Sequence, residues 1–185
     1  FIKRQICRCH GATADLEKEM DALLACFMQN NVAYTLFDHP PVYTSEEASQ
    51  VRGVELKTGV KAMLVREKEG GRFLLADLAA DRKLDFRKLE DLVKAKHVRF
   101  ATREEVLSQT GCEPGSVHPV GRLFGIETLL DSSVMENEFV NFNIGMLTHS
   151  VKIRSRDLLR VLIPDVIADF SKVRSSPTLV RAENT

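Results

Sequence analysis

Two apolar segments, residues 61–67 and 72–78, constrain the fold more than any other feature of this sequence. Both are rich in residues that favour strands, and the intervening Lys68-Glu69-Gly70-Gly71 has the two glycines of a tight turn. The sequence therefore predicts a β-hairpin whose two strands run antiparallel.

The remaining elements do not follow a regular strand–helix–strand alternation. Apolar periodicity predicts helices at 14–30, 44–51, 85–94, 102–109 and 155–163, with Thr44, Thr102 and Ser155 as starting residues. Short strands are expected at 32–37, 98–100, 127–130, 138–142 and 150–154, and a loop over 111–125. This order predicts the α+β class with a mixed or largely antiparallel sheet, and argues against a doubly wound fold.

Chain length, net charge and cysteine content limit the possible domain organisation and functions. The 185 residues suit one domain, expected over 14–173, between an N-terminal extension (1–13) and a flexible tail or linker (174–185). No apolar run approaches the ~20 residues of a membrane span, and the charged start does not look like a signal peptide. The formal net charge is zero, so any contact with nucleic acid is expected to be local. We interpret the four cysteines as reduced thiols of a cytoplasmic protein.

Two segments could bind an anion. Lys61 opens an apolar strand beside a loop, where its ammonium could point into a cleft and hold a phosphate or carbonyl oxygen, or could simply cap the strand in solvent. Residues 111–121, rich in Gly and Pro, could present successive backbone N–H groups to an anion, or could serve as a rigid connector.

Other candidates are weaker. In residues 142–150, His149 could order a water molecule, or could be an ordinary surface histidine. Cys7, Cys9 and His10 resemble half of a zinc site without the second ligand pair, so we expect no metal. Basic side chains that could meet an acceptor stem, or form solvated faces, are Lys94, Lys96, Arg99, Lys152, Arg154 and Arg156.

The order of these motifs resembles one family. From about Val32 to Phe170, the chain is similar to the YbaK/ProX group, the editing domains associated with prolyl-tRNA synthetase. The matching blocks are 39–48, 59–62, 79–81, 110–115 and 142–147. The resemblance implies a mixed, largely antiparallel, barrel-like sheet flanked by helices, and no cofactor. It also implies deacylation, the hydrolysis of the ester between a wrong amino acid and the terminal adenosine of tRNA.

The signature lysine of the family matches Lys61, and its glycine loop matches Gly111 to Gly115. Catalytic positions would be Lys61, Gly111, Gly115, Asn143 and His149. Substrate-binding positions would be His39, Tyr43, Thr44, Met63, Pro114, Gly121, Gly145 and Ser150. The blocks look most like the branch that edits Ser-tRNA and Thr-tRNA, sometimes Ala-tRNA. Ala62 stands where the branch acting on alanine usually has Asn, whereas His149 matches a histidine of that branch.

The expected mechanism needs no strong nucleophile, because an aminoacyl ester is already activated. Lys61 would fix the terminal adenosine, and amides of Gly111–Gly115 would face the carbonyl oxygen. The neighbouring ribose hydroxyl, or a water ordered by Asn143 or His149, would complete the attack. Expected partners are aminoacylated tRNA and a synthetase or multi-synthetase complex. The alternatives are a non-catalytic module that docks the tRNA end, and a metal hydrolase using Cys7, Cys9 and His10.

Overall fold

A computed structural model describes residues 12–174. Its helices are α1 (Ala12–Gln29), α2 (Ser45–Arg52), α3 (Phe86–Val93), α4 (Arg103–Thr110) and α5 (Ser155–Leu162). Its strands are β1 (Tyr34–Asp38), β2 (Val60–Glu67), β3 (Phe73–Ala79), β4 (Arg82–Leu84), β5 (Val98–Phe100), β6 (Glu127–Asp131), β7 (Phe139–Asn143), β8 (His149–Arg154), β9 (Val166–Ala168) and β10 (Ser171–Val173). Short 3-10 helices are η1 (Leu56–Thr58), η2 (Gly121–Leu123) and η3 (Ser132–Glu136). The predicted helices and strands are all present, whereas β4, β9, β10 and the 3-10 helices were not predicted.

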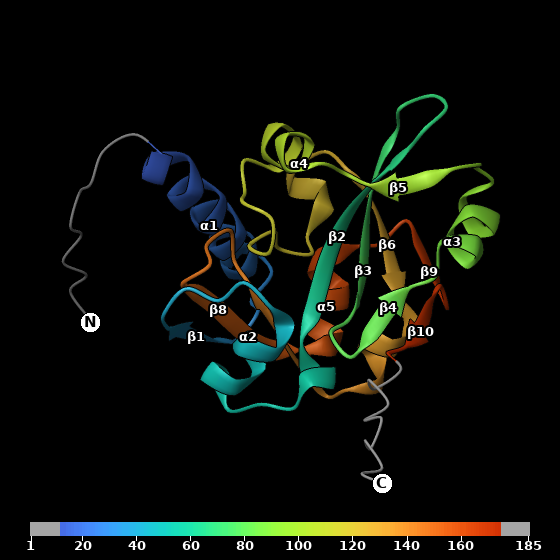
Figure 1. Cartoon of the computed structure of the whole chain (residues 1–185). Coiled ribbons are helices and arrows are strands. Elements are labelled where there is room, and N and C mark those ends of the chain that lie inside the picture. Colours follow the sequence, from blue (N-terminus) through green and yellow to red (C-terminus); the bar gives the residue numbers. More distant parts are fainter. Residues whose placement is uncertain (1–11, 175–185) are drawn as a thin grey trace, which may run out of the picture.

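The largest sheet has five strands in the order β5-β2-β3-β6-β9 (Figure 1). The predicted hairpin forms its centre, with β2 and β3 antiparallel and Met63 opposite Ala76. β6 joins β3 in parallel, and β9 joins β6 in parallel, so the sheet is mixed.

Two smaller sheets are wholly antiparallel. One has the order β1-β8-β7, and the other pairs β10 with β4. The α+β class with largely antiparallel pairing is therefore confirmed. A closed barrel is not formed by the strand pairings of residues 12–174, which give three open sheets.

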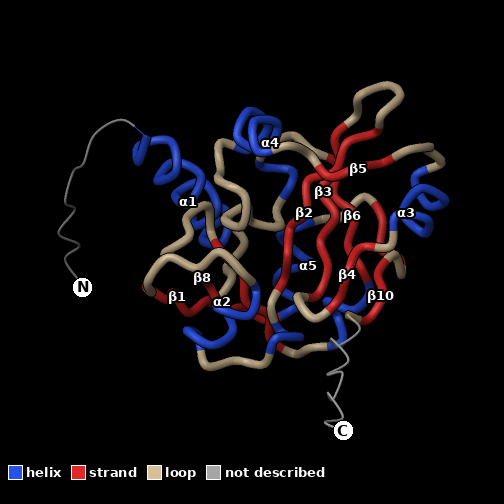
Figure 2. The backbone as a smooth tube through the Cα atoms, in the orientation of Figure 1, coloured by secondary structure: helices blue, strands red, loops and turns tan. Residues whose placement is uncertain are grey.

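Apolar side chains form three clusters around these sheets. The first cluster packs α1 and α5 against the β7–β8 sheet, with Phe27, Phe142 and Leu158 fully buried. The second lies between α3, β4 and one face of the five-stranded sheet. The third lies under α4 and the loop that follows it, with Leu75 and Cys112 fully buried. Figure 2 shows the resulting arrangement, in which helices surround the strands of the large sheet.

Two of the three predicted helix-capping residues, Thr44 and Thr102, do cap a helix. Thr44 and Thr102 each accept a hydrogen bond from the backbone N–H three residues on, and Glu47 and Glu105 complete the reciprocal contact. The expected cap at Ser155 is wrong. Arg154 occupies the capping position without a side-chain hydrogen bond, and the hydroxyl of Ser155 instead donates to the carbonyl of Glu138. This contact ties α5 to the residues just before β7.

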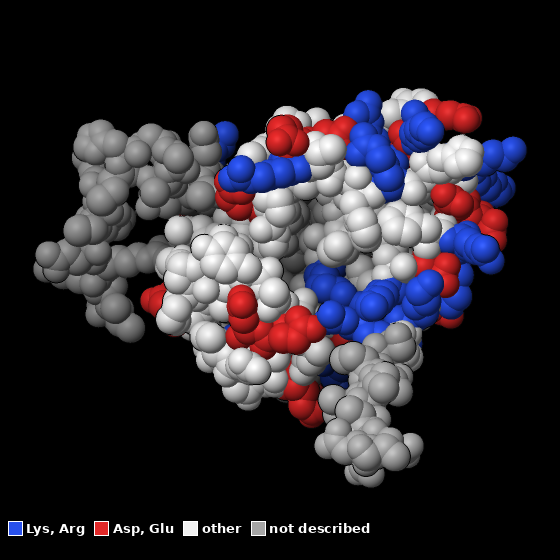
Figure 3. Space-filling model, viewed as in Figure 1, with Lys and Arg blue, Asp and Glu red and all other residues white. Residues whose placement is uncertain are grey.

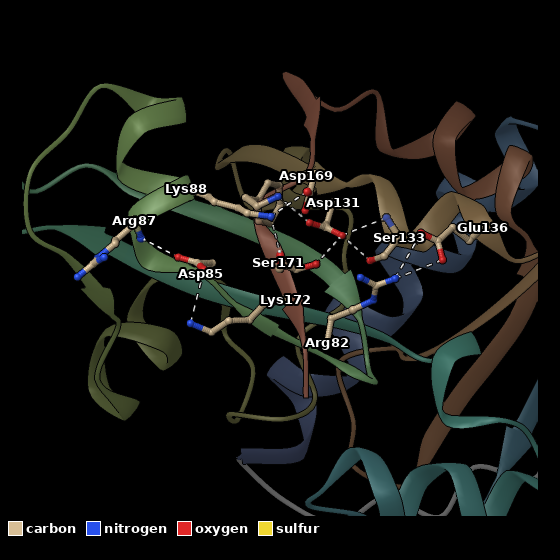
Figure 4. Close-up of polar contacts among 11 residues, drawn as sticks. Arg82, Asp85, Arg87, Lys88, Asp131, Ser133, Glu136, Asp169, Ser171 and Lys172 are labelled. Carbon is tan, nitrogen blue, oxygen red and sulfur yellow. Dashed lines mark hydrogen bonds and ion pairs between the residues drawn. The ribbon is translucent and has the colours of Figure 1, made fainter. Parts of the chain in front are cut away.

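A buried carboxylate anchors the last described strand. Asp131, at the end of β6, accepts hydrogen bonds from the backbone N–H of Ser133 and Phe170, and from the hydroxyls of Ser133 and Ser171 (Figure 4). Ser171 begins β10, which in turn pairs with β4. The position of β4 therefore depends on contacts made by a residue distant in sequence.

Candidate active site

A cavity of about 330 Å³ opens along the edge of β2. Its walls come from α2 and the residues before it, the start of β2, the turn at Pro114–Gly115, and the end of β7. The lining residues are Val42, Tyr43, Thr44, Ser45, Ala48, Ser49, Arg52, Val54, Leu56, Gly59, Val60, Lys61, Ala62, Met63, Ala80, Pro114, Gly115, Val117, Phe142 and Asn143. Figure 3 shows this face hollowed near its middle, with Lys and Arg atoms at the lower margin of the hollow.

Lys61 is a half-buried cation in this lining. Its ammonium donates a hydrogen bond to the backbone carbonyl of Arg82 in β4, which fixes the direction of the side chain. The pKa of Lys61 is lowered to about 8, chiefly by burial and also by the positive charges of Arg174 and Lys83, while Glu46 and Asp81 oppose the shift. The amine is therefore mostly protonated at neutral pH and loses its charge as pH rises through about 8.

Arg52 is a second cation in the cavity, and the sequence analysis did not identify it. Its Nε donates to the hydroxyl of Ser150 at 2.9 Å, and its Nη2 donates to the side-chain oxygen of Asn143. Burial lowers the pKa of Arg52 to about 10, so the guanidinium stays charged at neutral pH. A signal was available, because Ser45, Ala48 and Arg52 follow helical spacing on one face of α2.

Asn143 connects the two walls of the cavity. Its amide nitrogen donates to the carbonyl of Gly115 at 2.7 Å, while its oxygen accepts from Arg52. Gly115 has a φ of 90°, a backbone conformation that strongly favours glycine. The predicted residues Asn143 and Gly115 are therefore brought together with Arg52, although Asn143 holds protein groups in place as well as facing the cavity.

Four of the eight predicted substrate-binding residues also line the cavity, namely Tyr43, Thr44, Met63 and Pro114. His39 and Ser150 lie just behind the lining. The Nε2 of His39 is 3.0 Å from the Ser150 hydroxyl, which also accepts from Arg52. These two residues therefore orient the arginine from outside the lining.

The other predicted site residues lie outside the lining. The imidazole of His149 contacts Asp38 at 3.3 Å and the hydroxyl of Thr148 at 2.8 Å. Gly145 donates its N–H to the carbonyl of Ser116. Gly121 packs so tightly that a Cβ there would come within 2.3 Å of the Thr128 hydroxyl, which indicates a structural role.

The predicted anion-binding loop is mostly occupied by its own contacts. Gly111 donates its N–H to the carbonyl of Leu107, and Cys112 donates to the hydroxyl of Thr110. Pro114 has no N–H to offer. The structure thus corrects the expectation of several free amides over Gly111–Gly115, because among these five residues only Pro114 and Gly115 line the cavity.

A different main-chain donor lies in β2. The carbonyl of Leu64 accepts a hydrogen bond from Ala101, on the side of β2 away from β3. Alternate residues of a strand direct their backbone groups to the same side, so the N–H of Ala62 also points away from β3. β5 pairs only with residues 65–67, and Ala62 lines the cavity. The edge of β2 therefore presents the Ala62 amide to the cavity.

The charge of the lining is one-sided. It contains Arg52 and Lys61, and none of its members is an Asp or Glu. Such a cavity favours an anionic ligand, because each cation was desolvated on folding without a carboxylate partner in the lining.

The alternative of a metal hydrolase has no support in residues 12–174. Among these residues, no group of three or more His, Cys, Asp or Glu side chains is placed to bind a metal ion. Cys7, Cys9 and His10 lie outside the described residues. Cys112 is buried, and burial raises the pKa of its thiol to about 12, so it is not a reactive thiolate. Within residues 12–174, no helix combines the length and apolar character that crossing a membrane requires.

Comparisons with known proteins find similar sequences in one family. A family model described as the aminoacyl-tRNA editing domain matches residues 39–161. The multifunctional Ser/Thr-tRNA deacylase ProXp-y of Escherichia coli K12 is 30% identical over 78% of this chain and 89% of its own length. A proline–tRNA ligase of Bacillus licheniformis is 38% identical over 60% of this chain, but over only 21% of its own length.

A solved structure shares the fold. It is that of a candidate trans-editing enzyme for prolyl-tRNA synthetase, with a TM-score of 0.71, 23% identity, and coverage of 89% of this chain and 99% of that one.

Proposed function

Because this chain belongs to the aminoacyl-tRNA editing domain family, we propose that it hydrolyses the ester of mischarged tRNA carrying Ser, Thr or Ala. The Ser/Thr-tRNA deacylase similar to most of the chain supports the choice of a small amino acid. Ala62 in the lining supports it further, since an alanine there adds little bulk and no polar group beside Lys61.

The observation that carries the proposal is the lining with two cations and no carboxylate. The 3′ end of aminoacyl-tRNA brings a phosphate, an adenosine and an ester into the site. Lys61 has two N–H groups beyond the one that contacts Arg82, and Arg52 has donors beyond those used by Ser150 and Asn143. These groups can hold the terminal phosphate and so position the ester.

Hydrolysis then requires an attacking oxygen and a donor for the developing oxyanion. We assign the donor to the backbone N–H of Ala62, supported by the Gly115 turn on the opposite wall. The 2′- or 3′-hydroxyl next to the ester can assist attack by water, which requires no protein base among the lining residues. His149 stays outside this scheme, because its imidazole is engaged with Asp38 and Thr148 away from the lining.

The size and polarity of the cavity determine which amino acids can be removed. A cavity of about 330 Å³ lies at the low end of small-molecule sites, and terminal adenosine takes much of it. Small side chains therefore fit beside Val60 and Val117, while larger ones are excluded. Association with a synthetase and a cytoplasmic location stay predictions.

The experiment is a deacylation panel with Ser-, Thr-, Ala-, Cys- and Pro-tRNA. We expect hydrolysis of the first three, and a loss of about 100-fold in kcat/KM for Lys61→Ala, because one ligand of the terminal phosphate is removed. Lys57→Ala is the matched control, since this exposed lysine of η1 pairs with Glu55 and lies outside the lining. Undiminished hydrolysis by Lys61→Ala would remove Lys61 from the mechanism. Tight binding of tRNA without any hydrolysis would instead favour the docking alternative.

A further inference from the structure

Two lysines face each other on the small β4–β10 sheet. Lys83 of β4 is directly opposite Lys172 of β10 in the antiparallel register, and both are exposed. Directly opposed residues have Cβ atoms roughly 5 Å apart, and like charges in that position are unfavourable. A pair of this kind is stabilised when an anion lies across both ammonium groups.

Neighbouring carboxylates compensate this pair only in part. Asp85 lies 3.5 Å from the ammonium of Lys172, and the same carboxylate caps α3 by accepting from the N–H of Arg87. For Lys83, no ion pair with another described residue is found. The described Arg174, which follows β10, pairs with Glu46 of α2. We call Lys83, Lys172 and Arg174 the basic ridge.

The basic ridge adjoins the cavity. Lys61 bonds to the carbonyl of Arg82, the residue next to Lys83, and both Lys83 and Arg174 act electrostatically on Lys61. Figure 3 shows Lys and Arg atoms forming a band from the lower margin of the hollow across the region where Figure 1 places β4 and β10. The positive surface is therefore continuous from the cavity outward.

The basic side chains that the sequence analysis singled out lie on other elements than the basic ridge. Lys152 and Arg154 both lie over the ring of Phe139, and Arg154 also pairs with Glu138. Arg99 forms two contacts with the carboxylate of Glu105. Internal partners do not separate these side chains from the basic ridge, because Lys172 and Arg174 also have carboxylate partners. They differ from the ridge in position, since none of them lines the cavity or acts electrostatically on Lys61.

We propose that the basic ridge binds backbone phosphates of the acceptor strand whose 3′ end enters the cavity. The inference rests on the proposed function, and it assigns the surface along which tRNA approaches. Phosphates adjacent to the terminal adenosine would leave the cavity past Lys61 and cross the Lys83–Lys172 pair. The contact is independent of base sequence, because an ammonium recognises phosphate charge alone.

The test compares two double variants, Lys83→Gln/Lys172→Gln and, as the matched control, Lys152→Gln/Arg154→Gln. Each removes two positive charges from one small surface. For the ridge variant we expect KM for Ser-tRNA to rise about tenfold with kcat nearly unchanged. The plot of log(kcat/KM) against log salt should also become shallower by about 1.4 to 1.8, the contribution of two phosphate contacts. The control should match the unsubstituted protein in both quantities.

A second substrate separates this inference from the proposed function. Seryl-adenosine carries the ester without any phosphate, so the ridge variant should hydrolyse it at the unsubstituted rate. Equal KM and salt dependence for the ridge variant and the unsubstituted protein, with tRNA still deacylated, would overturn the ridge and leave the activity intact. If KM and the salt dependence changed only in the control variant, the basic ridge would also be ruled out, and the phosphate-binding surface would instead include Lys152 and Arg154 of β8. Absence of hydrolysis with the unsubstituted protein would count against the proposed function itself.

Discussion

At the scale of single residues, the protonation of Lys61 should control activity. Its pKa is lowered to about 8, chiefly by burial, so the cation is present below that pH and is lost as pH rises through it. The neutral amine binds phosphate poorly, and kcat/KM reports the free enzyme. We therefore expect kcat/KM for Ser-tRNA to fall with increasing pH, with a midpoint near 8. Rates must be corrected for spontaneous ester hydrolysis, which accelerates in alkali.

Lys61→Arg provides the control for this pH profile. A guanidinium keeps its charge over the whole range, so any activity that the variant retains should not decline above pH 8. A flat profile for the unsubstituted protein from about pH 7 to 9.5 would show that protonation of Lys61 does not limit the reaction.

Sequence reasoning found some of these residues and missed others for a physical reason. Lys61 was assigned to the site through the resemblance to the editing domains, because its position at the start of an apolar strand was equally compatible with a cap in solvent. Arg52 ends a polar helix, where an exposed arginine is common, and only the tertiary contact with Asn143 and Ser150 shows that it is enclosed. Gly111 was assigned to the site because its loop is glycine-rich, but its N–H closes α4 instead.

At the scale of elements, the placement of β4 should depend on Asp131. Asp131→Ala removes the acceptor of the buried Phe170 and Ser133 N–H groups, so we expect the free energy of unfolding to fall by about 3 kcal/mol. Urea denaturation measures this loss. Activity should fall too, because β10 supports β4, whose Arg82 carbonyl holds Lys61.

The matched control is Ser171→Ala, which removes one of the hydrogen bonds to the same carboxylate and should cost about 1 kcal/mol. Equal losses for the two variants would show that Asp131 does not act as the common anchor of these groups.

The strands missed by sequence analysis share one property. β4, β9 and β10 have three residues each, as β5 does, but none of the three shows the apolar–charged–apolar alternation of Val98-Arg99-Phe100. β9 and β10 also follow Pro164, which ends the predicted helix, and no strand or helix was predicted between that proline and residue 173. Their structure comes from partners far away in the chain, such as β10 pairing with β4 and β9 with β6. Local sequence therefore predicted the central hairpin well and these edges poorly.

At the scale of the whole molecule, the cavity exists because two sheets approach each other at Gly59. This residue forms an isolated bridge with Asn141 of β7, and its carbonyl accepts the N–H of Ala80 at 2.8 Å. A Cβ on residue 59 would lie 2.9 Å from the Cβ of Ala80, closer than such atoms can approach. Ala80 continues the β2–β3 register, in which Val60 is opposite Ala79, so this close packing lies within the five-stranded sheet, at the point where β7 joins it beside the cavity.

Gly59→Ala should therefore impair both stability and function. We expect a loss of about 1 to 3 kcal/mol in the free energy of unfolding, because overpacking must push the start of β2 and the end of β3 apart, together with a fall in kcat/KM as Lys61 moves with β2. The double variant Gly59→Ala/Ala80→Gly removes the opposing Cβ and should recover most of both losses, whereas Ala80→Gly alone should have only a small effect. A double-mutant cycle from urea unfolding and Ser-tRNA deacylation measures the coupling. If the losses were additive, with no recovery, contact between these two residues would not be what positions the start of β2 against the end of β3.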